Sequence, residues 1–422
     1  MYRLYKYGFL VFAFSLPNFE ALKYIGFFIM LMGFSGRVIW EKSITINKLS
    51  TIDWLIITIL LSSVLSTLLN WPLTSGTKDL RHTACFLSTF WMLYRSEPDP
   101  KLLIQVAMAL MAGTLTGLCL ACYNLFLTTG ASFNLGEFEL SFNLISAVSR
   151  SGSFAATMLF VCIGIIIDNS NNFKRNILLF AAVFLTIISA YILIAGGRSS
   201  VLSIAIVYLF LLFQCFKNKK YIKLLIIQTL VISCTIILLL QCLSPDIGRL
   251  HHLTSTKFSF KINEMATHDQ IRYDYWRVGI AQIFQKPSFF GVGPGNFKSI
   301  NIKNLNFDPP LLKESIQLIN GAPNHSHNWL LTTWAETGLL GFLAFLSLLI
   351  CITYKLWQNR PVHLKNVVNW TWVASFSAIL IACIDGFFNS SFTQENGWLT
   401  FVLMGIGINA IRKPQDSSHE KK

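Results

Sequence analysis

The sequence predicts an all-α polytopic membrane protein with about twelve transmembrane helices, and three observations lead to this class. First, 53% of the 422 residues are hydrophobic and only 13% are charged, whereas soluble domains carry roughly 25% charged residues. Second, apolar runs recur along the whole chain at about the 20 residues needed to cross a hydrocarbon core of roughly 30 Å. Third, basic residues gather in alternate loops.

The expected transmembrane segments are distributed over both halves of the chain. Two of them, Gly8–Leu16 and Ala84–Tyr94, are short or interrupted, and the first is interpreted as a retained span because no small-residue cleavage pattern follows Pro17. The other ten are Phe27–Trp40, Ile52–Leu69, Leu102–Leu127, Ser153–Ile167, Ile177–Ala195, Val201–Phe216, Leu224–Cys242, Trp329–Tyr354, Val367–Ile384 and Trp398–Ile411.

The distribution of Lys and Arg predicts the orientation. With the amino terminus in the cytoplasm, the cytoplasmic segments hold twenty Lys and Arg residues, and the short loops on the other side hold five, among them Lys23 and Arg198. This is the bias expected of an inner-membrane protein with both termini inside. The net charge of +14 is therefore explained by membrane topology, and no nucleic acid is expected as a partner. Lys23 is expected to be exposed.

The predicted spans divide the chain into four parts. Residues 1–243 contain helices one to nine, residues 244–328 form a long periplasmic loop with short helices, residues 329–411 contain helices ten to twelve, and residues 412–422 are a cytoplasmic tail. Within the loop, Asp269–Phe284 is expected to be helical, with an apolar stripe of Ile271, Tyr275, Val278, Ile280 and Ile283. A Gly/Pro turn follows at 291–295.

Two segments on the periplasmic side contain arginines that could bind an anion. Arg198 follows two glycines and precedes a helix, where Ser199 or Ser200 could provide the cap; the alternative is an arginine that reaches the lipid headgroups. Arg272 and Arg277 are five residues apart, so only one of them is expected to face a given site. The alternative for this pair is a solvated helix face.

The most specific motif is Pro-Asn-His-Ser-His-Asn-Trp at 323–329, directly before an apolar helix. His325 and His327 share a side if this segment is extended, and Asn328 is a candidate N-cap. The positive end of the helix lowers the pKa of a nearby histidine, and a neutral imidazole can act as a general base. Metal binding by the two histidines is the alternative, although no third ligand at a definite spacing is visible. Glu336, nine residues after His327, is expected to face the bundle or a cavity.

Two arginines and a neutral histidine on one face suit a particular substrate. Arginines bind a diphosphate through forked, charge-assisted bonds and stabilise it as a leaving group. A histidine can deprotonate an attacking hydroxyl. A lipid-linked diphospho-sugar is a membrane substrate that needs both groups.

The chain resembles the O-antigen ligases of Gram-negative bacteria, within a superfamily that includes the O-antigen polymerases. The resemblance covers the helical layout with the long loop between the ninth and tenth helices. It also covers Gly-Gly-Arg-Ser-Ser at 196–200, Arg272 with Phe-Phe-Gly-Val-Gly-Pro-Gly-Asn-Phe at 289–297, and the segment from His325 through Glu336 to the Thr-Gly-Leu-Leu-Gly turn at 337–341.

The resemblance implies transfer of a polysaccharide from undecaprenyl diphosphate to a sugar hydroxyl of lipid A–core, with inversion and without a metal or other cofactor. Carried over by motif, Arg198 and Arg272 bind the diphosphate, and His327 is the general base. His325, Asn328 and Glu336 support the site.

Three alternatives remain open. An O-antigen polymerase uses the same kind of donor and transfers it to another lipid-linked repeat. A flippase or transporter would place charged groups at mid-membrane on broken helices, whereas this chain gathers its candidate residues on one face. A purely structural membrane protein is the third alternative.

Overall fold

The structure, a computed structural model, describes residues 1–42, 44, 49–70, 76–96, 99–129, 152–168, 175–195, 198–215, 258–285, 287–312, 325–360, 369–388, 392 and 394–412. These residues form twelve α-helices and two short 3-10 helices, and they contain no β-strand. The α-helices are α1 (Tyr2–Ser15), α2 (Glu20–Ile39), α3 (Thr51–Leu69), α4 (Gly76–Arg95), α5 (Pro100–Thr129), α8 (Gly152–Ile167), α9 (Arg175–Ala195), α10 (Arg198–Cys215), α13 (Phe258–Gln285), α15 (Trp329–Gln358), α16 (Trp370–Gly386) and α17 (Gln394–Arg412). The 3-10 helices are η1 (Phe297–Ser299) and η2 (Ile302–Asn304).

The predicted class of an all-α polytopic membrane protein is confirmed. Four helices are long and apolar enough to cross a membrane, namely α2, α3, α5 and α15, and five shorter apolar helices lie in α8, α9, α10, α16 and α17. Eleven of the twelve predicted spans coincide with a described helix. The twelfth, Leu224–Cys242, lies outside the described residues, and the division of the chain at residues 243, 328 and 411 stays a prediction.

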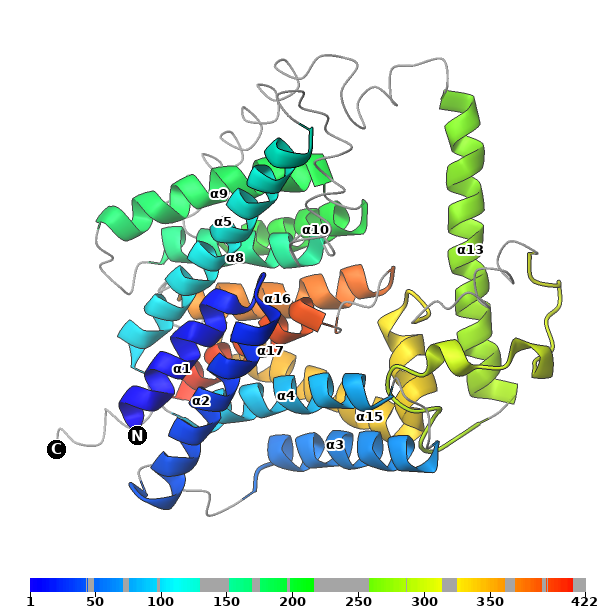
Figure 1. Ribbon diagram of the computed structural model, residues 1–422, viewed down its shortest axis with the longest axis horizontal. Coiled ribbons are helices and arrows are strands. Elements are labelled where there is room, and N and C mark those ends of the chain that lie inside the picture. The colour runs from blue at the N-terminus through cyan, green and yellow to red at the C-terminus, as the bar shows by residue number, and fades with distance from the viewer. Residues whose placement is uncertain are drawn as a thin grey trace.

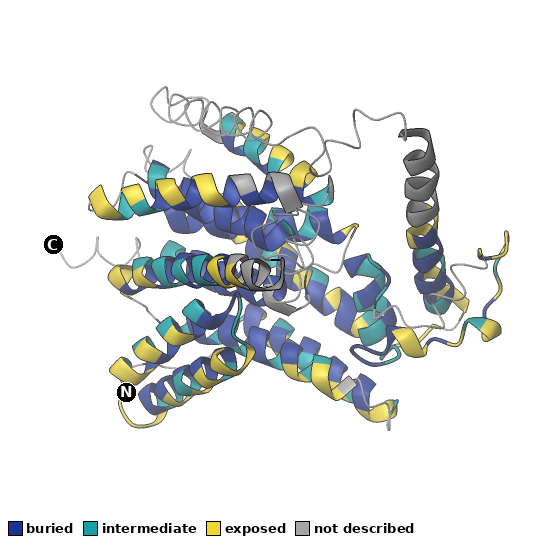
Figure 2. Cartoon of the chain, turned by 45° about the horizontal axis from the view of Figure 1, so that its top comes forward, coloured by how far each residue is buried: buried dark blue, intermediate teal, exposed yellow. Residues whose placement is uncertain are grey.

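The helices other than α13 pack into one bundle, and α13 stands beside it (Figure 1). Buried residues line the facing sides of the bundle helices, and exposed residues lie on their outer sides (Figure 2). Large apolar side chains such as Leu69 and Phe213 are more than 60% exposed, as expected where a helix contacts lipid tails rather than water. The apolar exterior and the buried interior together fit a membrane-embedded bundle.

Small residues allow α1 and α2 to pack closely as a helical hairpin. A methyl group added at Gly26 would lie 2.4 Å from the backbone nitrogen of Phe12, and one added at Gly33 would lie 2.3 Å from that of Tyr5. Such contacts between small residues and a facing backbone are typical of helix pairs in lipid, where apolar side chains gain little by leaving the tails.

The two ends of the bundle can be assigned from contacts. At one end, the Asn70 side chain after α3 donates to the Gly291 carbonyl in the glycine-rich turn that follows α13, and Tyr24 in α2 bonds to His82 in α4. We call this the α13 end. At the opposite end, Asn409 in α17 donates to the Leu93 carbonyl in α4. The start of α1 and the end of α17 both lie at this opposite end (Figure 1), as an even number of spans requires.

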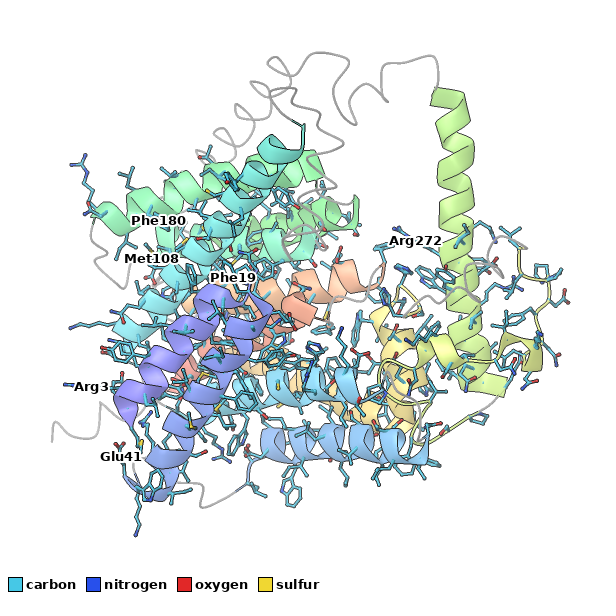
Figure 3. The ribbon with its side chains drawn as sticks, in the orientation of Figure 1. Arg3, Phe19, Glu41, Met108, Phe180 and Arg272 are labelled. Atoms are coloured by element: carbon cyan, nitrogen blue, oxygen red, sulfur yellow. The ribbon has the colours of Figure 1, made fainter. Side chains whose placement is uncertain are left out.

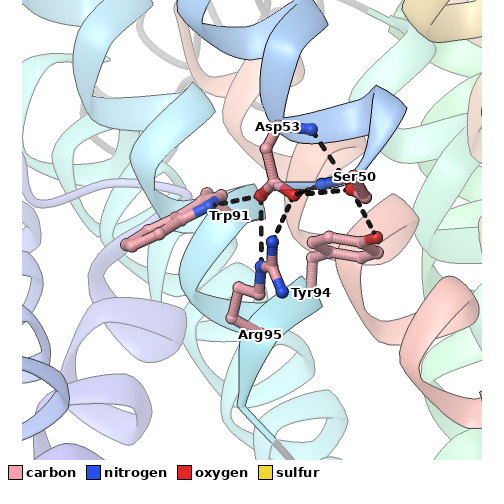
Figure 4. A network of polar contacts seen from close by, with 5 residues as sticks. All are labelled: Ser50, Asp53, Trp91, Tyr94 and Arg95. Carbon is pink, nitrogen blue, oxygen red and sulfur yellow. Dashed lines mark hydrogen bonds and ion pairs between the residues drawn. The ribbon is translucent and has the colours of Figure 1, made fainter. Parts of the chain in front are cut away.

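A buried carboxylate joins α3 to α4 at the opposite end (Figure 4). Asp53 is 1% exposed and pairs with Arg95, whose Nε lies 3.1 Å from Oδ1. The Trp91 indole donates to the same oxygen at 2.8 Å. The Ser50 backbone N–H donates to Oδ2 at 2.6 Å and completes a capping box for α3. Both carboxylate oxygens thereby accept hydrogen bonds from several donors, which is the condition under which a buried ion pair is tolerated.

We therefore predict that Asp53→Ala destabilises the protein by about 3 kcal/mol, because it removes the buried partner of an ion pair whose arginine is only 11% exposed. Thermal unfolding of the detergent-solubilised protein measures this. The matched control is Asp308→Ala, since Asp308 is an exposed aspartate outside the helices. Equal melting temperatures for the two variants would contradict the structural role of Asp53.

Candidate functional site

A second apolar core, separate from that of the bundle, holds α13 against the start of α15. The buried face of α13 includes Ile271, Tyr275 and Val278, and it packs with Phe297 of η1 and Ala335 of α15. The predicted apolar stripe is thus confirmed at Ile271, Tyr275, Val278 and Ile283, but it is wrong at Ile280, which is 44% exposed. Because Ile280 is only two residues from Val278, it points to a different side of the helix.

The segment before α15 is turned rather than extended. His327 has φ of +55°, in the left-handed region that non-glycine residues seldom occupy. Ser326 is fully buried, and its hydroxyl bonds to the Asn328 carbonyl at 2.8 Å and to the Thr332 hydroxyl at 2.9 Å. The histidines were expected to share a side if this segment were extended, and that condition is not met, because these bonds hold the chain in a tight turn.

Asn328 is the N-cap of α15, as predicted. Its side-chain oxygen accepts from the Leu331 backbone N–H at 3.2 Å. Its amide nitrogen donates to the Phe387 carbonyl, which follows α16, at 3.2 Å. One side chain therefore starts α15 and also ties it to the end of α16.

The His327 imidazole lies between two other rings. It stacks on Tyr275 of α13 with centroids 5.6 Å apart and an interplanar angle of 13°. The His325 ring meets it edge-on at 4.7 Å. The His327 Nδ1 is buried, and no hydrogen-bond partner for it is found among the described residues. The two histidines are thus brought together as predicted, although by a turn.

Burial and positive charge keep His327 neutral. The pKa of His327 is lowered from 6.5 to about 4, first by burial and then by the neighbouring His325 and the Arg272 charge. Burial also lowers the pKa of His325. The predicted direction is confirmed, but desolvation rather than the end of the helix is the main cause, because the ring is enclosed by α13 and α15.

The two arginines of α13 point in different directions, as predicted. Arg272 is exposed and, in Figure 3, lies on the side of α13 that faces the bundle. It is one helical turn before Tyr275, and its charge acts on His327. Arg277 instead pairs with buried Asp274 at 3.2 Å and donates to the Pro309 carbonyl. Of the two, Arg272 is the one available to a ligand beside His327.

Arg198 is the first residue of α10, and its side chain lies outside the described part of the chain. Ser199 and Ser200 lie inside the first turn, so neither is the N-cap that the sequence suggested, because the helix begins earlier. The Ser200 hydroxyl donates to the buried carboxylate of Asp385, at the end of α16, at 3.3 Å. The start of α10 is thereby placed at the end of the bundle where Asn328 contacts the residue after α16.

Glu336 holds the glycine-rich turn on α15. Its backbone carbonyl accepts from the Gly293 N–H at 2.9 Å and from the Ser66 hydroxyl of α3 at 2.8 Å. Its carboxylate accepts from the Phe297 N–H at 3.3 Å. The side chain is half-buried against protein, in keeping with the expected bundle-facing position, and its contacts position the turn.

Two glycines make this docking possible. Gly291 has φ of +68°, and a methyl group there would lie 2.5 Å from the Glu336 carbonyl carbon. Gly338 has φ of +71° and marks a kink within α15, where a methyl group would lie 2.2 Å from the Phe289 carbonyl oxygen. Both positions need a residue without a side chain, for conformation and for space.

Sequence reasoning missed two contributors to this site. Tyr275 was assigned only to an apolar stripe, yet its ring is the surface on which His327 stacks. Its position three residues after Arg272 was the available signal. Ser326 was treated as a spacer between the histidines, and nothing in its neighbours indicated that it would be buried. In the described part of the chain, no cluster of three His, Cys, Asp or Glu residues is arranged to hold a metal.

Comparison with known proteins identifies this region. Residues 181–346 match the family model described as O-Antigen ligase. The match runs from α9 through α10, α13 and the glycine-rich turn into α15, so it contains Arg198, Arg272 and His327. No curated protein matches the chain. The chain is therefore a multi-pass membrane protein in which residues 181–346 match the O-antigen ligase family.

Proposed function

We propose that the protein is an O-antigen ligase. It transfers a polysaccharide from undecaprenyl diphosphate to a sugar hydroxyl of lipid A–core, at the periplasmic face of the inner membrane and with inversion at the transferred sugar. The observation that carries this proposal is a neutral, half-buried histidine, His327, beside an exposed arginine, Arg272, within the region that matches that family. The excess of Lys and Arg in the loops at the opposite end supports a periplasmic α13 end.

In the proposed reaction, His327 acts as the general base. The imidazole takes the proton from the acceptor hydroxyl as its oxygen attacks the anomeric carbon of the donor sugar. The new glycosidic bond forms while the bond from that carbon to the phosphate oxygen breaks, and undecaprenyl diphosphate leaves. The proton remains on the imidazole until it is released to water.

The arginines act on the leaving group. Negative charge develops on the diphosphate as its bond to the sugar breaks, and a nearby guanidinium stabilises that charge more in the transition state than in the bound donor. Arg272 is exposed and borders His327. Arg198 begins α10, whose first turn is fixed to Asp385 at this end of the bundle. Both therefore suit a diphosphate held next to the base.

The His327→Ala variant tests the reaction and its class together. In a deletion strain complemented with His327→Ala, we expect normal amounts of the variant in the membrane and a loss of transfer of at least about 100-fold, which is the lower range for a general base. Unsubstituted core with lipid-linked polymer accumulating identifies a ligase, whereas core that carries a single repeat identifies a polymerase. Wild-type lipopolysaccharide in this strain would refute the role of His327.

The diphosphate role of Arg272 is tested with a surface control. We expect Arg272→Ala to lower kcat/KM for the lipid-linked donor by at least tenfold, because a charge-assisted contact to phosphate contributes about 1.5–3 kcal/mol. The control is Lys303→Ala, since Lys303 is exposed on η2 and makes no contact with His327. Equal losses in the two variants would mean that only bulk positive charge matters.

The pH profile tests the environment of His327. A base is active when deprotonated, so activity falls as the pH drops through its pKa. With the pKa of His327 at about 4, kcat/KM should stay nearly constant between pH 5.5 and 7.5, whereas a histidine with a pKa near 6.5 would lose about tenfold at pH 5.5. The bound anionic donor favours the imidazolium form and raises the pKa of His327 in the complex. Because kcat reports the complex, kcat should begin to fall at a higher pH than kcat/KM does. A fall in kcat/KM with its midpoint near pH 6.5 would contradict the lowered pKa of His327.

A further inference from the structure

Two phenylalanines next to the glycine-rich turn are largely exposed at the α13 end. Phe284, in the last turn of α13, and Phe289, in the segment that leads into the glycine-rich turn, are each 70% exposed. Single apolar side chains on a protein surface are ordinary, but a contiguous apolar patch marks a surface that contacts a partner or a membrane. The neighbours of these two residues show that they belong to such a patch.

Phe289 lies beside the exposed apolar side of α15. The Leu340 backbone N–H of α15 donates to the Phe289 carbonyl at 3.4 Å. Leu340 is 40% exposed, and it begins a stripe of exposed side chains at helical spacing that continues at Leu343, Ile350 and Tyr354. Because α15 is one of the helices that are long and apolar enough to cross a membrane, this stripe faces lipid. Phe289 is therefore next to the first residue of a lipid-facing stripe.

The end of α3 meets the same turn. Helix α3 is also a candidate span, with 19 residues, and it ends at Leu69, which is 67% exposed. The Asn70 side chain, directly after it, donates to the Gly291 carbonyl at 3.1 Å. Helix α15 is kinked at Gly338, and its part after the kink has about the length of roughly 20 residues that crosses a hydrocarbon core. Both spans therefore reach their α13 ends at the level of the segment that carries Phe289.

Phe284 joins this surface through Trp334 of α15. The centres of the two rings lie 6.0 Å apart, and Trp334 in turn stacks on Phe342, which follows the kink, at 4.9 Å. Helix α13 runs across the direction of α3, α4 and α16 (Figure 1), as a helix that lies along a membrane surface does. We call four exposed side chains the Phe289 patch, namely Leu69, Phe284, Phe289 and Leu340.

The charges around the Phe289 patch suit lipid. The sequence from Phe284 to Gly291 contains one charged residue, Lys286, whose side chain lies outside the described residues and whose sign matches anionic lipid phosphates. The carboxylates of Asp79 and Glu336 contact the later part of the turn, at Gly295 and Phe297. Four side chains also cover far less than the roughly 1,000 Å² that a stable protein interface buries, which favours a membrane over a second copy of the chain.

We propose that the Phe289 patch inserts into the membrane leaflet at the α13 end, so that Phe284 and Phe289 anchor α13 to the lipid surface. Phe289 contacts acyl chains, and Phe284 lies at the boundary with the headgroups, where aromatic side chains gather. Helix α13 carries Arg272 and packs on His327, so the anchor sets both residues at the depth of the lipid phosphates. This consequence for the donor rests on the proposed function, whereas the anchor itself does not.

The test uses the full-length protein with the photoreactive residue p-benzoylphenylalanine at one position, reconstituted in phosphatidylcholine vesicles with radioactive acyl chains. We expect ultraviolet light to attach lipid at positions 284 and 289 about as efficiently as at Leu343, a lipid-facing residue of α15. Labelling should be at least about fivefold lower at Asn304, an exposed polar residue of η2, because acyl chains are confined to the bilayer. Melting temperatures show that each variant is folded.

Lipid labelling at position 284 or 289 that is as low as at Asn304 would overturn the anchor. Cross-linking of either position to a second copy of the chain, seen as a dimer on a denaturing gel, would overturn it as well and would identify a protein interface instead.

Transfer assays separate the anchor from the proposed function. Phe289→Asp should raise KM for the lipid-linked donor at least about threefold, whereas Phe289→Trp, which keeps an aromatic side chain suited to the membrane interface, should leave it unchanged. An unchanged KM in Phe289→Asp would refute the effect of the anchor on donor binding. Lipid labelling at both positions without any transfer by the wild type would leave the anchor standing and refute the ligase.

Discussion

The architecture of the site depends on how the glycine-rich turn docks on the kinked start of α15. The carbonyl of Glu336 accepts bonds from both the turn and α3, and the left-handed conformations of Gly291 and Gly338 let the two backbones meet. This contact fixes α13 to the bundle through the second apolar core. It thereby holds Tyr275 against His327. The burial that lowers the pKa of His327 therefore depends on a backbone contact made at Glu336 and not at the histidine itself.

Much of the fold could be predicted because a bilayer imposes a simple rule on sequence. Each span must bury about 20 residues of apolar chain, and loops carry the charges that set orientation. Helix ends also follow local chemistry, as the Asn328 cap of α15 shows. Arg272, His325, His327 and Asn328 could be selected because their residue types suit phosphate binding, proton transfer and helix capping.

What the sequence could not provide was the pairing of distant segments. Lys23 was expected to be exposed because its loop is short, but α4 and α17 cover it. The conformation of the segment around His327 was left open, and the buried Ser326 holds it in a turn. Glu336 was expected to face the bundle or a cavity and to support the site, but the two bonds that its backbone carbonyl accepts, from Gly293 and from Ser66, could not be predicted. For Lys23 and Glu336 the deciding partner lies on another element, which composition or periodicity does not identify. For His327 the deciding bonds are local, but they require Ser326 to be buried, which its neighbours in the sequence do not indicate.

The most direct test of this account is an experimental structure of the protein with undecaprenyl diphosphate bound. We expect the diphosphate at the α13 end of the bundle, with the guanidinium groups of Arg198 and Arg272 within about 3 Å of its oxygens and the His327 imidazole facing the side where the sugar attaches. A diphosphate at the opposite end, or one that contacts neither arginine, would contradict the central claim that this end binds and cleaves a lipid-linked glycan.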